Sequence, residues 1–221
     1  MSDCTRDYTA ASAPANLNRY TEHYFTGSSV PFPFDRFATV EALAEAVLRG
    51  FSRRNFSAAR LGTGCSVRPV EACYQDEFYR SLQQVLGFSA KVTSKWYRDK
   101  DNGIDIIVEE PRWSIEIVRE GDRLSEHCNR FVGNGKYTPW IRNGSLQDWL
   151  IIDCRTSYPR EYSRSTTLCV LYIMDMWLQA NYSVEAPGTK LWRAVFAPDH
   201  TSLRILDANN QLVSGKFSLM P

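Results

Sequence analysis

Apolar and polar residues alternate most regularly between residues 103 and 119. Two alternating runs, 103–109 and 113–119, flank the turn residues Glu110 and Pro111, and this arrangement predicts a β-hairpin. An even loop centred on Glu110 and Pro111 places Asp105 directly opposite Glu116. The hairpin therefore carries two carboxylates at matching positions on neighbouring strands.

Directly opposed residues share one face of a sheet, with Cβ atoms roughly 4.5–5.5 Å apart. Two carboxylates this close repel each other unless a cation or a proton lies between them, so Asp105 and Glu116 indicate a divalent metal site. The alternative is a solvated sheet face on which both acids are exposed. In that case the apolar residues of the hairpin pack beneath them, namely Ile104, Ile106, Val108, Ile115 and Ile117.

Two helices are predicted before the hairpin. Thr39 can cap the first, whose apolar positions fall on one stripe. The second begins near Pro69 and runs to about Leu86, with Glu77 at the border of its apolar stripe, where a surface glutamate is the simpler interpretation. A strand at 88–97 carries Lys95 and follows this helix.

Further elements follow the hairpin. A helix at 122–131 places Arg123, His127 and Arg130 at three- and four-residue spacing, which gives it a cationic face. The continuous apolar run 149–154 is typical of a central strand covered on both faces. The segment 166–182 fits a helix by its length, although a strand has the same periodicity. Two strands at 192–197 and 203–207 and a short last strand complete the pattern, and we expect His200 to be exposed in the turn between them.

Composition bounds the class of protein. With 221 residues, 43% of them hydrophobic, the chain can bury one core, and 26 basic against 25 acidic residues give no strong field for nucleic acid or membrane. No signal peptide or membrane-spanning run is evident, so we expect an intracellular protein without a membrane partner. The six cysteines have no paired or framework spacing, which indicates reduced and mostly buried thiols. Residues 1–38 show no period and form an expected irregular extension to a domain at 39–221.

Several reaction classes lack support. There are three histidines and no serine-nucleophile elbow, cysteine–histidine signature, dinucleotide-binding glycine motif or zinc spacing. Gly133–Lys136 lacks the residues of a phosphate loop and is interpreted as a turn. The paired carboxylates, a glutamate-bearing helix and a cationic helix remain, in the order helix, three strands, helix, strand.

In this order the chain resembles the PD-(D/E)XK nucleases. More closely, four segments resemble the nuclease-like domain of Crinkler-type proteins of fungi and oomycetes: Glu71–Arg80, Gly103–Ile107, Ile115–Phe131 and Trp149–Arg155. The resemblance implies an α/β fold, a restriction-endonuclease-like mixed β-sheet with flanking helices. It also implies a Mg²⁺- or Mn²⁺-dependent endonuclease that cleaves DNA with little sequence specificity and acts in the nucleus.

The resemblance also assigns roles. Asp105 and Glu116 would bind the metal, Glu77 would complete the site, and Arg119 would join them as a catalytic residue. The phosphate would be bound by Arg123, His127 or Arg130 of the 122–131 helix, or by Lys95 of the 88–97 strand.

Two departures from the family pattern stand out. The family places a lysine two residues after the glutamate, and this position is Val118. Strand alternation directs Arg119 to the opposite face unless the strand ends there. The alternative function is therefore an inactive nuclease-like effector that binds nucleic acid or a protein partner. The segment 165–188 is also longer than the family needs and has the character of an insertion.

Overall fold

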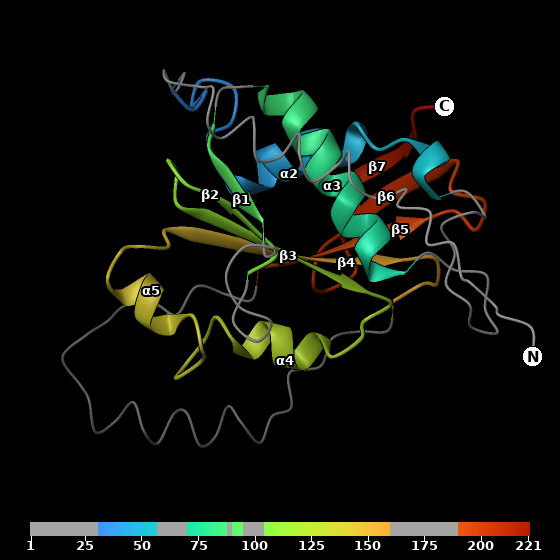
Figure 1. Cartoon of the computed structure of the whole chain (residues 1–221). Helices are drawn as coiled ribbons and strands as arrows, with labels where there is room; N and C mark the ends of the chain where they lie inside the picture. Colours follow the sequence, from blue (N-terminus) through green and yellow to red (C-terminus); the bar gives the residue numbers. More distant parts are fainter. Residues whose placement is uncertain (1–30, 57–69, 88–89, 95–103, 160–189) are drawn as a thin grey trace, which may run out of the picture.

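A seven-stranded mixed sheet organises the protein, as the computed structural model shows (Figure 1). The structure describes residues 31–56, 70–87, 90–94, 104–159 and 190–221. The strands lie in the sheet in the order of the chain: β1 (Val92–Ser94), β2 (Ile106–Val108), β3 (Trp113–Arg119), β4 (Asp148–Arg155), β5 (Leu191–Phe196), β6 (Ser202–Leu206) and β7 (Leu212–Ser218). The predicted α/β class, with a mixed sheet and flanking helices, is confirmed.

The direction of the strands changes across the sheet. β1, β2 and β3 form an antiparallel meander, β3, β4 and β5 run parallel, and β6 and β7 return antiparallel. Ile106 pairs with Ile115 and Val108 with Trp113, so the hairpin has the predicted register. The predicted central position of the 149–154 strand is also correct, because β4 is the fourth strand and is buried on both faces.

Helices α2 (Val40–Arg49) and α3 (Glu71–Leu86) cover one face of the sheet (Figure 1). The Thr39 side chain accepts a hydrogen bond from the Ala42 N–H at 3.2 Å, which confirms the predicted cap. Between the two helices lies a short 3-10 helix, η1 (Arg53–Phe56), which the pattern did not predict. The main core forms here, where Phe78 and Leu82 pack with Ile115 and Ile117 of β3.

The opposite face is covered by α4 (Leu124–Asn129) and α5 (Thr138–Arg142), both in the connection between β3 and β4 (Figure 1). Leu124, Cys128 and Phe131 pack there against Val118 and Trp149 in a second, smaller core. The sheet thus separates α3 from α4. This separation decides which side chains can meet.

Two expectations need correction. His200 lies in the predicted turn but is only 8% exposed, because its ring stacks on Phe56 with centroids 5.1 Å apart. The expected irregular extension contributes to the core at its end, since Phe32 is buried against Trp113.

The three described cysteines, Cys73, Cys128 and Cys154, are buried and free, as predicted. The segments 165–188 and 166–182 lie outside the described residues.

Candidate functional site

The two predicted acids lie near the open end of the β2–β3 hairpin. Asp105 immediately precedes β2, and the observed register places it opposite Glu116 of β3. Its Oδ2 accepts a hydrogen bond from the Ile117 N–H at 2.8 Å, in place of the main-chain carbonyl that a longer strand would supply. Asp105 is 6% exposed and Glu116 is 1% exposed, so the solvated alternative is wrong.

The charge of Glu116 is balanced by α4. His127 Nδ1 lies 2.6 Å from Glu116 Oε2, and Arg130 Nη1 lies 3.3 Å from Oε1. His127 and Arg130 are three residues apart and so project from the same side of the helix end. Burial alone would lower the pKa of Arg130, but the charge of Glu116 and contact with Tyr137 outweigh burial and raise it. Two predicted phosphate ligands therefore face inward, onto a carboxylate.

Glu77 lies on the other face of the sheet. Its helix, α3, packs on the main core, whereas Glu116 faces α4. The Glu77 carboxylate accepts hydrogen bonds from the Ser52 N–H, from the Asn55 amide and from Arg80, whose Nη2 lies 2.6 Å from Oε1. Glu77 thus anchors η1 to α3 and does not join the hairpin pair in this structure.

The other predicted site residues are also dispersed. Arg119 ends β3 in register with Cys154, whose side chain belongs to the core on the α3 face. Arg123 is exposed and 3.6 Å from Glu126. Lys95 lies outside the described residues. Val118, at the family's lysine position, is fully buried in the α4-side core.

These contacts bear on whether a metal would fit. Mg²⁺ requires near-octahedral oxygen ligands and usually keeps several waters. Here the oxygens of Glu116 contact the His127 ring and the Arg130 guanidinium, and one oxygen of Asp105 accepts from the main chain. Within the part of the chain that the structure describes, no group of three His, Cys, Asp or Glu side chains could hold a metal. The arrangement fits a carboxylate neutralised by the protein better than it fits a metal ligand.

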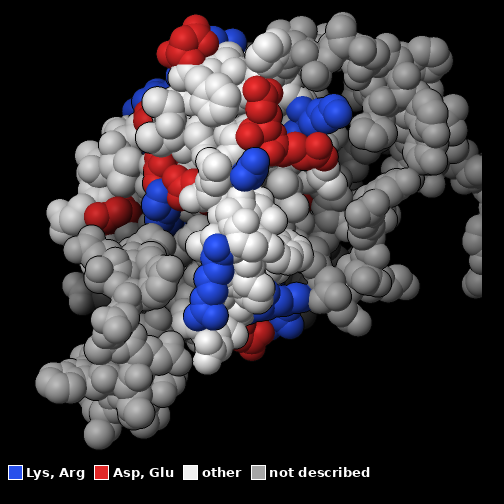
Figure 2. Space-filling view, turned by 90° about the vertical axis from the view of Figure 1, so that its left-hand side faces the viewer, with Lys and Arg blue, Asp and Glu red and all other residues white. Residues whose placement is uncertain are grey.

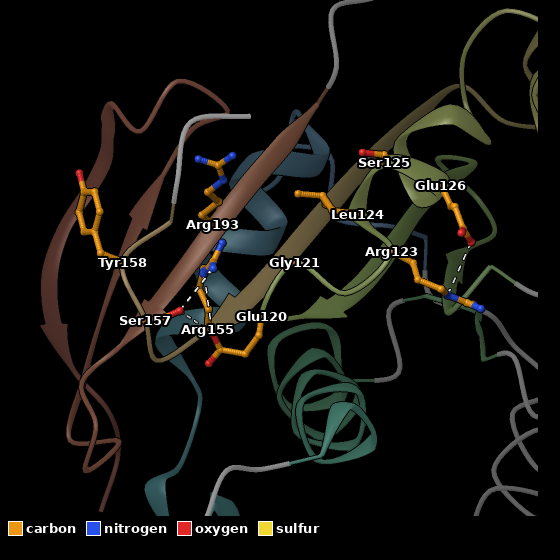
Figure 3. Close-up of a pocket in the computed structure, with 10 residues that line it drawn as sticks. All are labelled: Glu120, Gly121, Arg123, Leu124, Ser125, Glu126, Arg155, Ser157, Tyr158 and Arg193. Carbon is orange, nitrogen blue, oxygen red and sulfur yellow. Dashed lines mark hydrogen bonds and ion pairs between the residues drawn. The ribbon is translucent and has the colours of Figure 1, made fainter. Parts of the chain in front are cut away.

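A cleft of about 720 Å³ opens beside this cluster, where β3 and β4 end and α4 begins (Figure 3). The polar residues that line it come from the strand ends and from α4: Glu120, Arg123, Ser125, Glu126, Arg155, Ser157, Tyr158 and Arg193. In Figure 3 the Arg155 and Arg193 side chains come from neighbouring strands, β4 and β5, and extend in the same general direction. Three of the lining residues are arginines and two are glutamates.

The register explains the cleft. Val118, Asp153 and Arg193 lie side by side on β3, β4 and β5, on the face that α4 covers. Asp153 is fully buried, and its carboxylate accepts from the Gly121 N–H at 2.7 Å and from Arg155 Nη1 at 3.0 Å. Burial raises the pKa of Asp153, although Arg155 and the Gly121 N–H oppose this rise. Burial also lowers the pKa of Arg193.

Pattern reasoning missed Arg155 and Arg193. A signal was present in both cases, because each is a charged residue within or at the end of an apolar strand run, where a charge is costly unless it has a role. The strand pairing that brings them together could not be read from the runs themselves.

Comparison with known proteins gives no match to a family model, to a curated protein or to a solved structure. Within the described ranges, no helix has the length and apolar character needed to cross a membrane.

Proposed function

We propose that this protein is a nuclease-like domain of the restriction-endonuclease type that binds nucleic acid through its phosphates without cutting it. The observation that carries the proposal is the cluster in which His127 and Arg130 neutralise Glu116. The order of elements supports the fold assignment, since α3, the β1–β3 meander, α4 and β4 follow one another as the resemblance implies.

The cluster argues against cleavage for an electrostatic reason. A divalent ion at Glu116 would have to displace His127 and Arg130 from the carboxylate, and it would then lie beside the partly buried Arg130 guanidinium of like charge. Val118 adds to the argument, because an isopropyl side chain cannot polarise a water molecule as the family's lysine does. Nucleic-acid binding requires neither a metal at Glu116 nor a lysine that polarises water, so it can remain when cleavage is lost.

The arginines of the cleft support phosphate binding. Arg123, Arg155 and Arg193 line one hollow, and guanidinium groups match phosphate oxygens in geometry and charge. On the face shown in Figure 2, basic and acidic side chains occur in small mixed groups without a continuous basic band. We therefore expect contact with few phosphates rather than a long electrostatic footprint.

A second candidate is the Mg²⁺- or Mn²⁺-dependent endonuclease that acts on DNA. The position of Asp105 opposite Glu116 favours it, because this is the pair of acids that the family uses. It requires that His127 and Arg130 leave Glu116 when nucleic acid and metal bind. A protein partner is the remaining alternative if nucleic acid does not bind.

Plasmid nicking and DNA binding separate these candidates. Purified protein is incubated with supercoiled plasmid and Mg²⁺ or Mn²⁺, beside Asp105→Asn and Glu116→Gln, and binding of labelled single- and double-stranded oligonucleotides is measured in EDTA. We expect binding in EDTA and no nicking above the buffer control. Nicking by the wild type that both variants lose would establish the second candidate. Failure to bind either form of DNA would refute the first.

Arg123→Gln and Arg54→Gln form a matched pair for the binding assay. Both side chains are exposed arginines, but Arg123 lies at the cleft and Arg54 lies on η1, on the other face of the sheet. We expect only Arg123→Gln to weaken binding. Equal effects would show that binding follows net charge and not the cleft.

A further inference from the structure

We infer that the cleft between α4 and the ends of β4 and β5 binds a nucleotide, with its phosphate held between Arg155 and Arg193. The inference deepens the proposed function by naming a ligand and a subsite. It rests on the proposed function only for the nucleoside part of the ligand, because the phosphate contact follows from the arginines themselves.

Arg193 is the first argument for an anion. Its side chain is 1% exposed, and its Nε has no hydrogen-bond partner among the described residues. Arg193 Nη1 donates a hydrogen bond to the side-chain oxygen of Asn210, which carries no charge. In the described ranges no carboxylate lies within ion-pair distance of this guanidinium. The charges of Asp153 and Asp207 act on Arg193 without forming an ion pair with it, and an anion in the cleft would supply a direct charged contact and the missing acceptor.

Arg155 and its neighbours complete the subsite. Arg155 Nη1 donates to Asp153 at 3.0 Å and Nη2 donates to the Ser157 hydroxyl at 3.3 Å, which fixes the direction of the guanidinium. The acid nearest the opening, Glu120, is occupied, since it accepts from the Thr156 N–H at 2.8 Å and from the Ser157 hydroxyl at 2.6 Å. Glu120 and Asp153 therefore orient donors, and both Arg155 and Arg193 line the cleft (Figure 3).

The size and rim of the cleft indicate more than inorganic phosphate. A volume of about 720 Å³ falls in the range of sites for small organic ligands and exceeds that of a single phosphate group. Tyr158 stands at the rim with 61% of its surface exposed, and the Arg204 guanidinium lies 5.3 Å from the centre of its ring. An exposed tyrosine beside a phosphate subsite offers a flat surface on which a base can stack.

Isothermal titration calorimetry with three probes tests the inference: adenosine monophosphate, inorganic phosphate and adenosine. We expect adenosine monophosphate to bind most tightly, phosphate more weakly and adenosine without measurable heat. Arg193→Gln should weaken adenosine monophosphate at least about tenfold, the usual effect of losing a charge-assisted hydrogen bond. Tyr158→Ala should weaken adenosine monophosphate and leave phosphate unchanged, and Arg54→Gln should change neither.

Two results would overturn the inference: adenosine that binds as well as its monophosphate, or wild-type protein that is folded by circular dichroism and binds neither phosphate compound. Arg193 is buried and its substitution can impair folding, so two variants at exposed positions provide an independent test. Arg123→Gln and Tyr158→Ala alter exposed positions of the same cleft. If neither variant weakens adenosine monophosphate binding, the inference is also overturned.

Oligonucleotides identify the source of the phosphate. If a 5′-phosphorylated strand competes with adenosine monophosphate and its 5′-hydroxyl counterpart does not, the subsite takes a terminal phosphate, whereas equal competition indicates a backbone phosphate. Adenosine monophosphate binding without any DNA binding would refute the proposed function and leave the nucleotide site intact. If the wild type binds DNA but not adenosine monophosphate, and Arg193→Gln still binds DNA, the nucleotide site is refuted and the proposed function stands.

Discussion

Replacing Glu116 by glutamine should destabilise the protein measurably. Glu116→Gln keeps the shape of the side chain but removes the charge that compensates Arg130 and His127, which lie 3.3 and 2.6 Å away. Removing one partner of a buried ion pair costs about 3–5 kcal/mol. Arg130 keeps 22% of its side chain exposed and glutamine can still accept from His127, so the lower figure, about 3 kcal/mol, applies.

Chemical and thermal unfolding, followed by circular dichroism, measure this loss. For a domain of this size about 3 kcal/mol corresponds to a decrease in Tm of about 6–12 °C. Glu126→Gln is the matched control on the same helix, because Glu126 is exposed and its pair with Arg123 spans 3.6 Å. We expect the control to change the free energy of unfolding by less than about 0.5 kcal/mol.

Binding of magnesium at Glu116 would contradict this assignment of its partners. A ligand that binds only the folded protein raises its Tm, so a metal bound by Glu116 would stabilise the wild type and not Glu116→Gln. We expect Mg²⁺ to leave the Tm unchanged relative to a sodium salt of equal ionic strength. A magnesium-dependent rise confined to the wild type, or a Glu116→Gln protein as stable as the wild type, would show that His127 and Arg130 are not the cations that Glu116 requires.

Four further predictions test other parts of the structure. Burial lowers the pKa of His200, so the unfolded chain takes up a proton first and stability falls as the pH drops below about 6.5; urea unfolding from pH 8 to pH 5 should show a shallower fall for His200→Asn. Gly121 has φ +73°, and Gly121→Ala should cost about 1–2 kcal/mol through backbone strain although its Cβ has room. Phe32→Ala should cost about 3 kcal/mol in the same assay, because its ring is buried against Trp113, and a neutral effect would show that the extension is dispensable. If three arginines contact phosphates, the logarithm of the DNA-binding constant should fall with the logarithm of salt concentration with a slope of about −3, and a much steeper slope would contradict a localised site.

The sequence by itself determined the local elements. Alternation of apolar residues and the turn at Glu110 and Pro111 were sufficient to place Asp105 opposite Glu116, because strand periodicity and loop parity fix the register of a hairpin. Thr39 marked the start of α2, since a hydroxyl before an apolar stripe satisfies a free N–H. The continuous apolar run of β4 predicted its central position for the same kind of reason, namely that it must be covered on both faces.

The tertiary structure alone decided which of these residues meet. The chain pattern placed Glu77 near the core but did not say on which face of the sheet α3 would pack, and it packs away from Glu116. The cationic side of α4 could have faced solvent or the sheet, and two of its members face Glu116. Arg155 and Arg193 are 38 positions apart and come together through parallel pairing of β4 and β5. Such contacts depend on the packing of whole elements, a long-range property that no local pattern encodes.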